Sequence, residues 1–170
     1  PENVVPNPAD PDRGHINFWR TESVPADNGV YADPMAGPPC PLPPPKGGTM
    51  FRFFQIAPEK NEAGLSKEER DRRMAKMFEA AGAGHARLAM NRHPSMHRTE
   101  SVDYIILLQG EVTCLLDVGE VRMKPFDVLI QRGTNHGWVN RSTAPARIAV
   151  MLTDARPKRG DSVAGTQNAR

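Results

Sequence analysis

The sequence predicts an all-β protein, an antiparallel sandwich or barrel that carries one short helix and follows a proline-rich N-terminal arm. Three observations support this prediction. From Ala86 onward, short runs with a two-residue apolar period follow one another, separated by turn residues. One segment alone has the three- and four-residue spacing of an amphipathic helix. Twelve of the 17 prolines lie within the first 45 residues.

Composition excludes several classes of protein. The 170 residues carry a net charge of +2, with 25% charged residues, so bulk charge does not indicate a nucleic-acid partner. No apolar stretch approaches the roughly 18 residues of a membrane helix, and the N-terminal residues lack a signal-peptide pattern. Cys40 and Cys114 do not make a disulfide framework. We therefore expect a cytoplasmic protein that binds neither nucleic acid nor membranes.

Residues 1–47 are predicted to form an extended arm. The segment has no sustained helical or strand period and is rich in proline. Its few aromatic residues, of which we take Phe18, Trp19 and Tyr31 as anchors, favour an arm packed on a surface over a free tail. The arm could cover its own barrel or that of a partner.

The barrel is predicted to span residues 48–155, and it includes the helix. A Phe-rich strand runs from Met50 to Ile56 and is followed by a helix over 66–82. Ser66 and Glu69 form a capping box at the start of this helix, and glycines end it.

Seven further strands are predicted, each bounded by turn chemistry. They are Ala86–Asn91, Asp103–Gln109, Val112–Asp117, Glu120–Lys124, Asp127–Arg132, His136–Asn140 and Ala146–Thr153. Strands this short, at this spacing, are typical of a sandwich or barrel. Residues 156–170 form a polar C-terminal tail.

Residues that can bind a metal gather at two of these runs. His97 and Asp103 are an even number of positions apart, and so are His136 and Trp138, so the members of each pair are expected on the same face of a strand. If both faces line one cavity, two imidazoles and one carboxylate meet there. Such a set suits a divalent iron, manganese, nickel or zinc ion. His93 or Gln131 could complete it.

The same residues resemble the two motifs of the cupin superfamily. His97-Arg98-Thr99-Glu100-Ser101-Val102-Asp103, then six residues and Gly110, is similar to the first motif. Gln131-Arg132-Gly133-Thr134-Asn135-His136, then three residues and Asn140, is similar to the second. The resemblance implies an antiparallel jelly-roll barrel, often a homodimer.

Three positions depart from the cupin pattern. The resemblance makes His97 and His136 metal ligands, but Thr99 stands at the position of a second histidine and is a poor ligand. Asp103 replaces a glutamate and is one methylene shorter, and Gln131 replaces a proline. Either a metal remains on His97, Asp103 and His136, or the metal has been lost and the cavity binds by hydrogen bonds.

We assign further roles to residues near these positions. His136, Asp103 and Gln131 are the predicted catalytic residues. The predicted substrate-binding residues are Arg98, Arg132, Trp138 and Thr99. Cys114 is expected to be inert core, and Asn140 to stabilise a turn.

Two functions remain open at this stage. The first is a metal-dependent cupin enzyme acting on a small organic acid or a phenolic or carbonyl compound, by decarboxylase, lyase, isomerase or dioxygenase chemistry. The second is a metal-free module that binds or senses a small hydrophobic carboxylic acid, with Arg98 or Arg132 pairing with its carboxylate.

Overall fold

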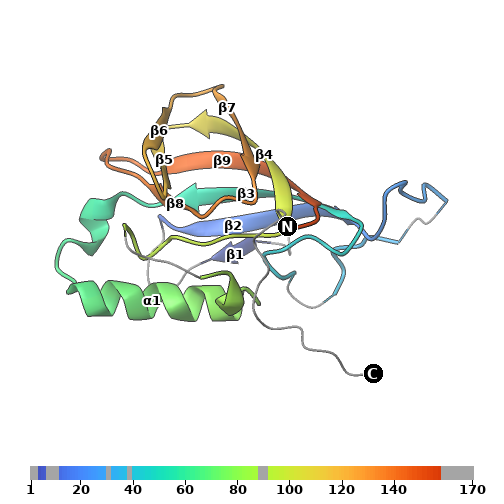
Figure 1. Cartoon of the computed structure of the whole chain (residues 1–170), viewed down its shortest axis with the longest axis horizontal. Helices are drawn as coiled ribbons and strands as arrows, with labels where there is room; N and C mark the ends of the chain where they lie inside the picture. Colours follow the sequence, from blue (N-terminus) through green and yellow to red (C-terminus); the bar gives the residue numbers. More distant parts are fainter. Residues whose placement is uncertain (1–3, 7–11, 30–31, 38–39, 88–91, 158–170) are drawn as a thin grey trace.

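Two antiparallel sheets face each other in the computed structural model, and one α-helix runs along one side of them (Figure 1). The structure describes residues 4–6, 12–29, 32–37, 40–87 and 92–157. The six-stranded sheet has the order β1 (Val4–Pro6), β2 (Gly14–Thr21), β3 (Thr49–Ile56), β9 (Ala146–Asp154), β4 (Ser101–Gln109), β7 (Val128–Arg132). The three-stranded sheet has the order β6 (Glu120–Met123), β5 (Val112–Leu116), β8 (His136–Val139). The predicted all-β barrel is confirmed.

The core lies between the two sheets. On β4, buried Ile105 and Leu107 alternate with more exposed neighbours, and Ile148 and Val150 of the adjacent β9 are buried in the same core cluster. Cys114 on β5 is fully buried, and burial raises the pKa of its thiol to about 12, so it is inert core as predicted.

The N-terminal segment 1–47 differs from the extended arm that its composition suggests. It contains β2, which has no proline between residues 14 and 21 and pairs along β3. Later in the same segment, Met35 and Cys40 are buried in the main core cluster. The arm is therefore part of its own barrel, as edge strand and as cover.

Of the aromatic anchors expected for the arm, Phe18 contacts the rings of Phe51 and Phe53 on β3, but neither Phe18 nor Trp19 is buried. Phe18 and Trp19 lie on β2 with about half their surface exposed, at 42% and 50%, and Tyr31 lies outside the described residues. The buried contacts of the segment come from the loop after β2. Its apolar side chains Met35, Cys40 and Leu42 pack into the core, and prolines flank them in the sequence.

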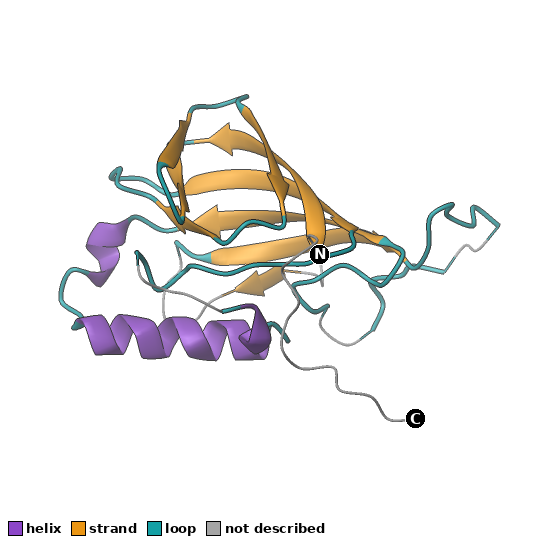
Figure 2. Ribbon diagram, viewed as in Figure 1, coloured by secondary structure: helices purple, strands orange, loops and turns teal. Residues whose placement is uncertain are grey.

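Helix α1 (Lys67–Ala80) begins where the capping box predicts. Ser66 Oγ accepts from the backbone N–H of Glu69, whose carboxylate accepts from the backbone N–H of Ser66. Met74 and Phe78 form its buried stripe, and Figure 2 shows the helix running beneath the strands.

Two short 3-10 helices complete the described fold, η1 (Glu59–Glu62) and η2 (Gly84–Ala86). The predicted strand Ala86–Asn91 is not seen, because Ala86 ends η2 and residues 88–91 lie outside the described part. Most of the predicted tail, residues 158–170, also lies outside it. None of the helices in the described ranges has the length and apolar character needed to span a bilayer.

Candidate functional site

Two histidines meet where the barrel approaches helix α1. His97 lies on the segment between η2 and β4, and His136 is the first residue of β8. Their ring centroids are 4.3 Å apart, and both residues are buried. The ring of His97 also contacts Phe78 of α1, and that of His136 contacts Trp138. The structure thus brings together the two imidazoles that the sequence assigns to one site.

Both rings are held in the same tautomer by backbone carbonyls. His97 Nδ1 lies 2.8 Å from the carbonyl oxygen of Ser95, and His136 Nδ1 lies 3.0 Å from that of Thr134. A carbonyl only accepts, so each Nδ1 carries the proton and donates it, and each Nε2 keeps its lone pair. Within the described part of the chain, neither Nε2 has a hydrogen-bond partner.

Burial keeps both imidazoles neutral. It lowers the pKa of His97 to about 3, an effect to which the neighbouring His136 contributes. It also lowers the pKa of His136 to about 4. At neutral pH the pair therefore presents two uncharged Nε2 acceptors.

The turn before His136 has the geometry its motif requires. Gly133 has a φ of +56°, a conformation that L side chains rarely adopt. Gln131, buried on β7, donates from Nε2 to the carbonyl oxygen of Thr134 at 3.2 Å. Gln131 therefore holds the carbonyl that in turn orients the imidazole of His136.

Asp103 is buried on the inner face of β4, opposite Gln131 in the register. Burial raises the pKa of Asp103 to about 6, against the effect of the nearby hydroxyls of Ser101 and Thr99 and of the Arg52 cation. Its Oδ1 atom is buried and has no hydrogen-bond partner. Asp103 thus has an unused acceptor inside the barrel.

The residues fit a metal ion only in part. An imidazole whose Nδ1–H is fixed by a carbonyl is typical of histidines that ligate metals through Nε2. However, among the residues that the structure describes, no group of three or more His, Cys, Asp or Glu side chains could hold a metal together. The donor set that fits is therefore the pair His97 and His136, and Asp103 does not join it.

Thr99 and Trp138 are close to this site in different ways. Thr99 is buried, and its Oγ1 accepts from Ser101 Oγ at 2.8 Å, next to Asp103. Trp138 is half-buried, packs against the main core cluster, and meets the His136 ring edge-on. Trp138 therefore forms a wall beside the imidazoles.

The two arginines predicted to bind substrate differ in their position relative to the histidines. Arg132 is exposed on β7, and Gln131 before it points inward, so the guanidinium of Arg132 lies on the outer face of the sheet. Arg98 is half-buried next to His97, and its backbone N–H donates to the carbonyl of Ala86. Arg132 does not share the interior with the histidines.

The cation inside the barrel is Arg52 of β3, which the sequence did not single out. It is 1% exposed, and its Nη2 donates to the carbonyl oxygen of Pro41 at 2.8 Å. Burial lowers the pKa of Arg52 to about 10, so it remains charged at neutral pH. Its Nε is buried without a partner, as is Oδ1 of Asn17, its register partner on β2.

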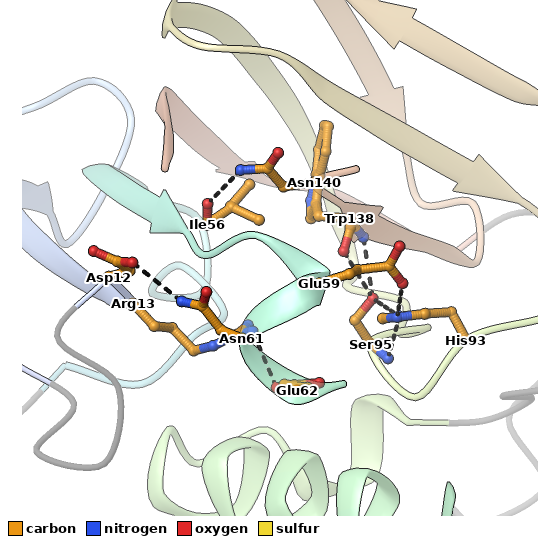
Figure 3. Close-up of polar contacts among 10 residues, drawn as sticks. All are labelled: Asp12, Arg13, Ile56, Glu59, Asn61, Glu62, His93, Ser95, Trp138 and Asn140. Atoms are coloured by element: carbon orange, nitrogen blue, oxygen red, sulfur yellow. Dashed lines mark hydrogen bonds and ion pairs between the residues drawn. The ribbon is translucent and has the colours of Figure 1, made fainter. Parts of the chain in front are cut away.

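His93 belongs to a separate polar network shown in Figure 3 and does not complete the site. Its Nδ1 lies 2.7 Å from Ser95 Oγ, and its Nε2 lies 3.3 Å from Glu59 Oε1. Ser95 Oγ also accepts from the backbone N–H of Trp138 at 3.1 Å. The network fixes the loop that carries His97 against strand β8.

Asn140 acts as a turn-stabilising residue, as predicted. Its Nδ2 donates to the carbonyl oxygens of Ile56 and Ala144, and its Oδ1 accepts from the backbone N–H and the hydroxyl of Ser142. One side chain therefore joins the end of β3 to the loop between β8 and β9 (Figure 3).

Comparison with known proteins finds relatives that match a segment of the chain. No family model matches it. A segment of 64 residues is 53% identical to Phomopsin biosynthesis cluster protein D of Diaporthe leptostromiformis, covering 36% of this chain and 34% of that protein. A segment of 66 residues is 42% identical to a cupin-domain-containing oxidoreductase of Hypocrea virens, with coverage of 36% and 34%. The matches thus span about a third of the length of these relatives.

Solved structures show a distant likeness. A cupin-2 domain from Rhodospirillum rubrum overlaps 91% of this chain and 70% of its own, with a TM-score of 0.45 and 10% sequence identity. A cupin 2 conserved barrel domain protein from Salinispora arenicola covers 91% and 83%, with a TM-score of 0.43 and 14% identity.

Proposed function

From the antiparallel barrel and the likeness of one segment to a cupin-domain-containing oxidoreductase, we propose that the chain is a cupin enzyme. It acts on a small organic acid or a phenolic or carbonyl compound bound beside His97 and His136. One observation carries the proposal. Two buried, neutral imidazoles, each fixed through Nδ1, leave both Nε2 atoms without a partner in the described residues. Structural histidines at a buried position normally have both ring nitrogens satisfied, so this pair is prepared for a ligand.

The polar interior favours an acidic or hydroxylated substrate. A neutral Nε2 accepts a hydrogen bond from a phenolic or enolic hydroxyl. A substrate that reaches from the histidines to the surroundings of Asp103 would meet the positive charge of Arg52, whose Nε has no hydrogen-bond partner among the described residues and can pair with a carboxylate or a developing oxyanion. In this proposal Arg52 has the carboxylate-binding role that Arg132, on the outer face, does not reach. Trp138 supplies an apolar wall.

A divalent metal on the histidine pair would supply Lewis-acid chemistry and activate oxygen or a carbonyl group. His97 and His136 would hold it through Nε2, with the remaining ligands coming from substrate and water. Several relatives are named oxidoreductases, which favours redox chemistry of the dioxygenase type over the decarboxylase, lyase or isomerase alternatives.

Elemental analysis of the protein purified without added metal tests this proposal. We expect near-stoichiometric iron, manganese, nickel or zinc in the wild type and its loss in His136→Ala. His85→Ala is the matched control, because His85 is exposed on η2 and its loss should leave the metal in place. Protein without metal that binds none of the four ions on addition would exclude the metal enzyme.

The second candidate is a metal-free module that binds a small hydrophobic carboxylic acid. It is favoured by one observation, that Asp103 stands apart from the two histidines and sits with Thr99, Ser101 and Arg52 instead. Retained binding of an aromatic acid such as benzoate by metal-free protein, abolished by Arg52→Met, would support it.

A further inference from the structure

His93, which does not join the histidine pair, is connected to His97 through a tight turn. The turn spans residues 93–96 and is closed by the backbone N–H of Met96, which donates to the carbonyl oxygen of His93 at 3.0 Å. Ser95 lies inside this turn and is buried, and its backbone carbonyl accepts from His97 Nδ1 at 2.8 Å. The turn therefore sets the direction of the acceptor that fixes the His97 ring.

The side chain of His93 holds the same turn. The backbone N–H of Ser95 donates to His93 Nδ1 at 3.1 Å, which resembles an Asx turn with an imidazole in place of the usual amide. An N–H only donates, so Nδ1 of His93 is the acceptor and carries no proton. Ser95 Oγ, 2.7 Å from this nitrogen, then donates its hydrogen to Nδ1 and accepts from the backbone N–H of Trp138 at 3.1 Å.

Glu59 favours the tautomer of His93 that these contacts require. Its Oε1 lies 3.3 Å from His93 Nε2 (Figure 3), and a carboxylate accepts from a ring nitrogen that carries a proton. The ring proton therefore lies on Nε2, and Nδ1 is available to accept from Ser95. His93 and His97 are thus held in opposite tautomers, with the proton on Nε2 in the first ring and on Nδ1 in the second.

We propose that Glu59 and His93 are positioning residues for the imidazole of His97, acting through the hydrogen-bond series Glu59–His93–Ser95–His97. The Glu59 carboxylate fixes the tautomer of His93, and His93 Nδ1 fixes the turn. The Ser95 carbonyl then fixes the rotation and the tautomer of His97, so that its Nε2 is kept as an acceptor. The inference rests on the proposed function, because it takes His97 Nε2 as an atom that meets the ligand.

The series runs from the surface to the buried site. The side chain of Glu59 is 43% exposed and that of His93 is 18% exposed, whereas His97 is buried. Glu59 is itself held in place, because its backbone N–H donates to the carbonyl oxygen of Asn140 at 2.9 Å, just after β8. A change at the surface is therefore carried to the His97 ring by hydrogen bonds between fixed elements.

Protonation of His93 would break the series at its second step. A proton on Nδ1 turns the acceptor into a donor, which then faces the N–H of Ser95. Burial lowers the pKa of His93. The charges of Glu59 and Glu62 on η1 act against burial, and that of Arg13, before β2, acts with it. The series is therefore intact at neutral pH and is lost only on acidification below about 6.5, the usual pKa of histidine.

Nitrogen NMR of the imidazole rings in the full chain tests the proposal, because the cross-peaks of each ring identify the nitrogen that carries the proton. The chain has five histidines, so single variants assign the spectrum. At neutral pH we expect the proton of His93 on Nε2 and that of His97 on Nδ1. His93→Leu should leave His97 as a mixture of tautomers. His93→Asn should restore the single form, because the asparagine oxygen accepts from the Ser95 N–H as in an ordinary Asx turn.

Glu59→Ala is a second variant, should His93→Leu fail to fold, because the Glu59 side chain is half-exposed. It should give a mixture of tautomers for His93, and Glu59→Gln, which keeps an acceptor, should restore the Nε2–H form. Glu62→Ala is the matched control on the same 3-10 helix, since Glu62 pairs with Arg13, and it should leave both rings unchanged.

Three results would overturn the proposal. The first is a wild-type His93 with its proton on Nδ1 at neutral pH. The second is a His97 spectrum that is the same in the wild type, His93→Leu and Glu59→Ala. The third is an equal disturbance of His97 in His93→Leu and His93→Asn, because packing of the ring would then hold the turn. These spectra need neither metal nor substrate, so they decide the inference even if the protein binds neither and the proposed function fails.

Discussion

His97 and His136 are joined twice, by backbone and by side chain. The N–H of each donates to the carbonyl oxygen of the other, at 2.8 and 2.9 Å, while their rings lie 4.3 Å apart. A loop residue and a strand residue are thereby held in fixed register. Because this pair of backbone hydrogen bonds sets the spacing of the rings, the relative position of the two Nε2 atoms is preorganised before a ligand binds.

Acidification is expected to destabilise the protein between pH 7 and pH 5. The folded chain holds the pKa values of His97 and His136 at about 3 and about 4, whereas an unfolded histidine titrates near 6.5. The unfolded chain therefore binds more protons in this window, and stability falls as the pH is lowered. Asp103, with its pKa raised to about 6, acts in the opposite direction and offsets part of the loss.

Urea unfolding at a series of pH values measures this effect. The balance of two histidines against one aspartate corresponds to about 1.4 kcal/mol per pH unit at most. The double variant His97→Gln/His136→Asn should show a much smaller loss. An equal loss in the variant would assign the acid sensitivity to other groups, such as His15 or His93, whose pKa values burial also lowers.

Removal of the Arg52 charge is expected to raise the pKa of Asp103 above its value of about 6. The guanidinium favours the ionised carboxylate, so Arg52→Met leaves the effect of burial opposed only by the hydroxyls of Ser101 and Thr99. Titration of the carboxyl carbon by NMR measures the shift. Arg132→Met, on the outer face, should leave the Asp103 titration unchanged, and a similar shift in both variants would contradict the interior position of Arg52.

Deletion of residues 1–45 is expected to lower the melting temperature sharply. It removes β2, which pairs along β3, together with Met35 and Cys40 of the main core. Each large buried side chain lost costs about 2 kcal/mol or more. Deletion of residues 1–11 is the control, since the three-residue strand β1 is what it removes from the part of the chain that the structure describes. Equal melting temperatures for the full chain and the longer deletion would show that the arm is not part of the fold.

Phe126→Gly is expected to stabilise the protein by about 1 kcal/mol. Phe126 has a φ of 74°, the only positive value at a non-glycine residue of the described chain, and its ring is 80% exposed. A left-handed backbone costs an L residue about 1–2 kcal/mol and costs glycine little. Phe126→Ala isolates the backbone effect, because it removes the ring and keeps the strain. Thermal unfolding should rank Gly above Ala, and the reverse order would exclude backbone strain.

The sequence predicted the barrel, the helix and the histidine pair, because each depends on local signals. Short apolar or alternating runs between turn residues mark β4 to β9, the capping box marks α1, and motif spacing marks His97 and His136. It did not predict the inner cation. On β3, Phe51 and Phe53 share one face and Arg52 occupies the other, so local patterning favours the phenylalanines as core. The tertiary fold reverses this orientation, since Arg52 faces inward.

The sequence also could not predict which side chains surround Asp103. Asp103 shares a motif with His97, but its surroundings are Ser101, Thr99 and Arg52, and these depend on which strands are neighbours. The sequence predicted an arm that covers a barrel, but it did not show which residues of the arm are buried, because proline-rich chain has no period that shows which side is buried.

The strand order constrains the sequence of folding events. Strand β9 lies between β3 and β4 in the large sheet, although it is the last strand of the described chain. Until residues 146–154 have left the ribosome, β3 and β4 each have an unpaired edge, and the apolar face between them is open. Completion of the sheet therefore waits for β9 and depends on long-range contacts, which predicts slow folding and a need for chaperone protection of the partly folded chain.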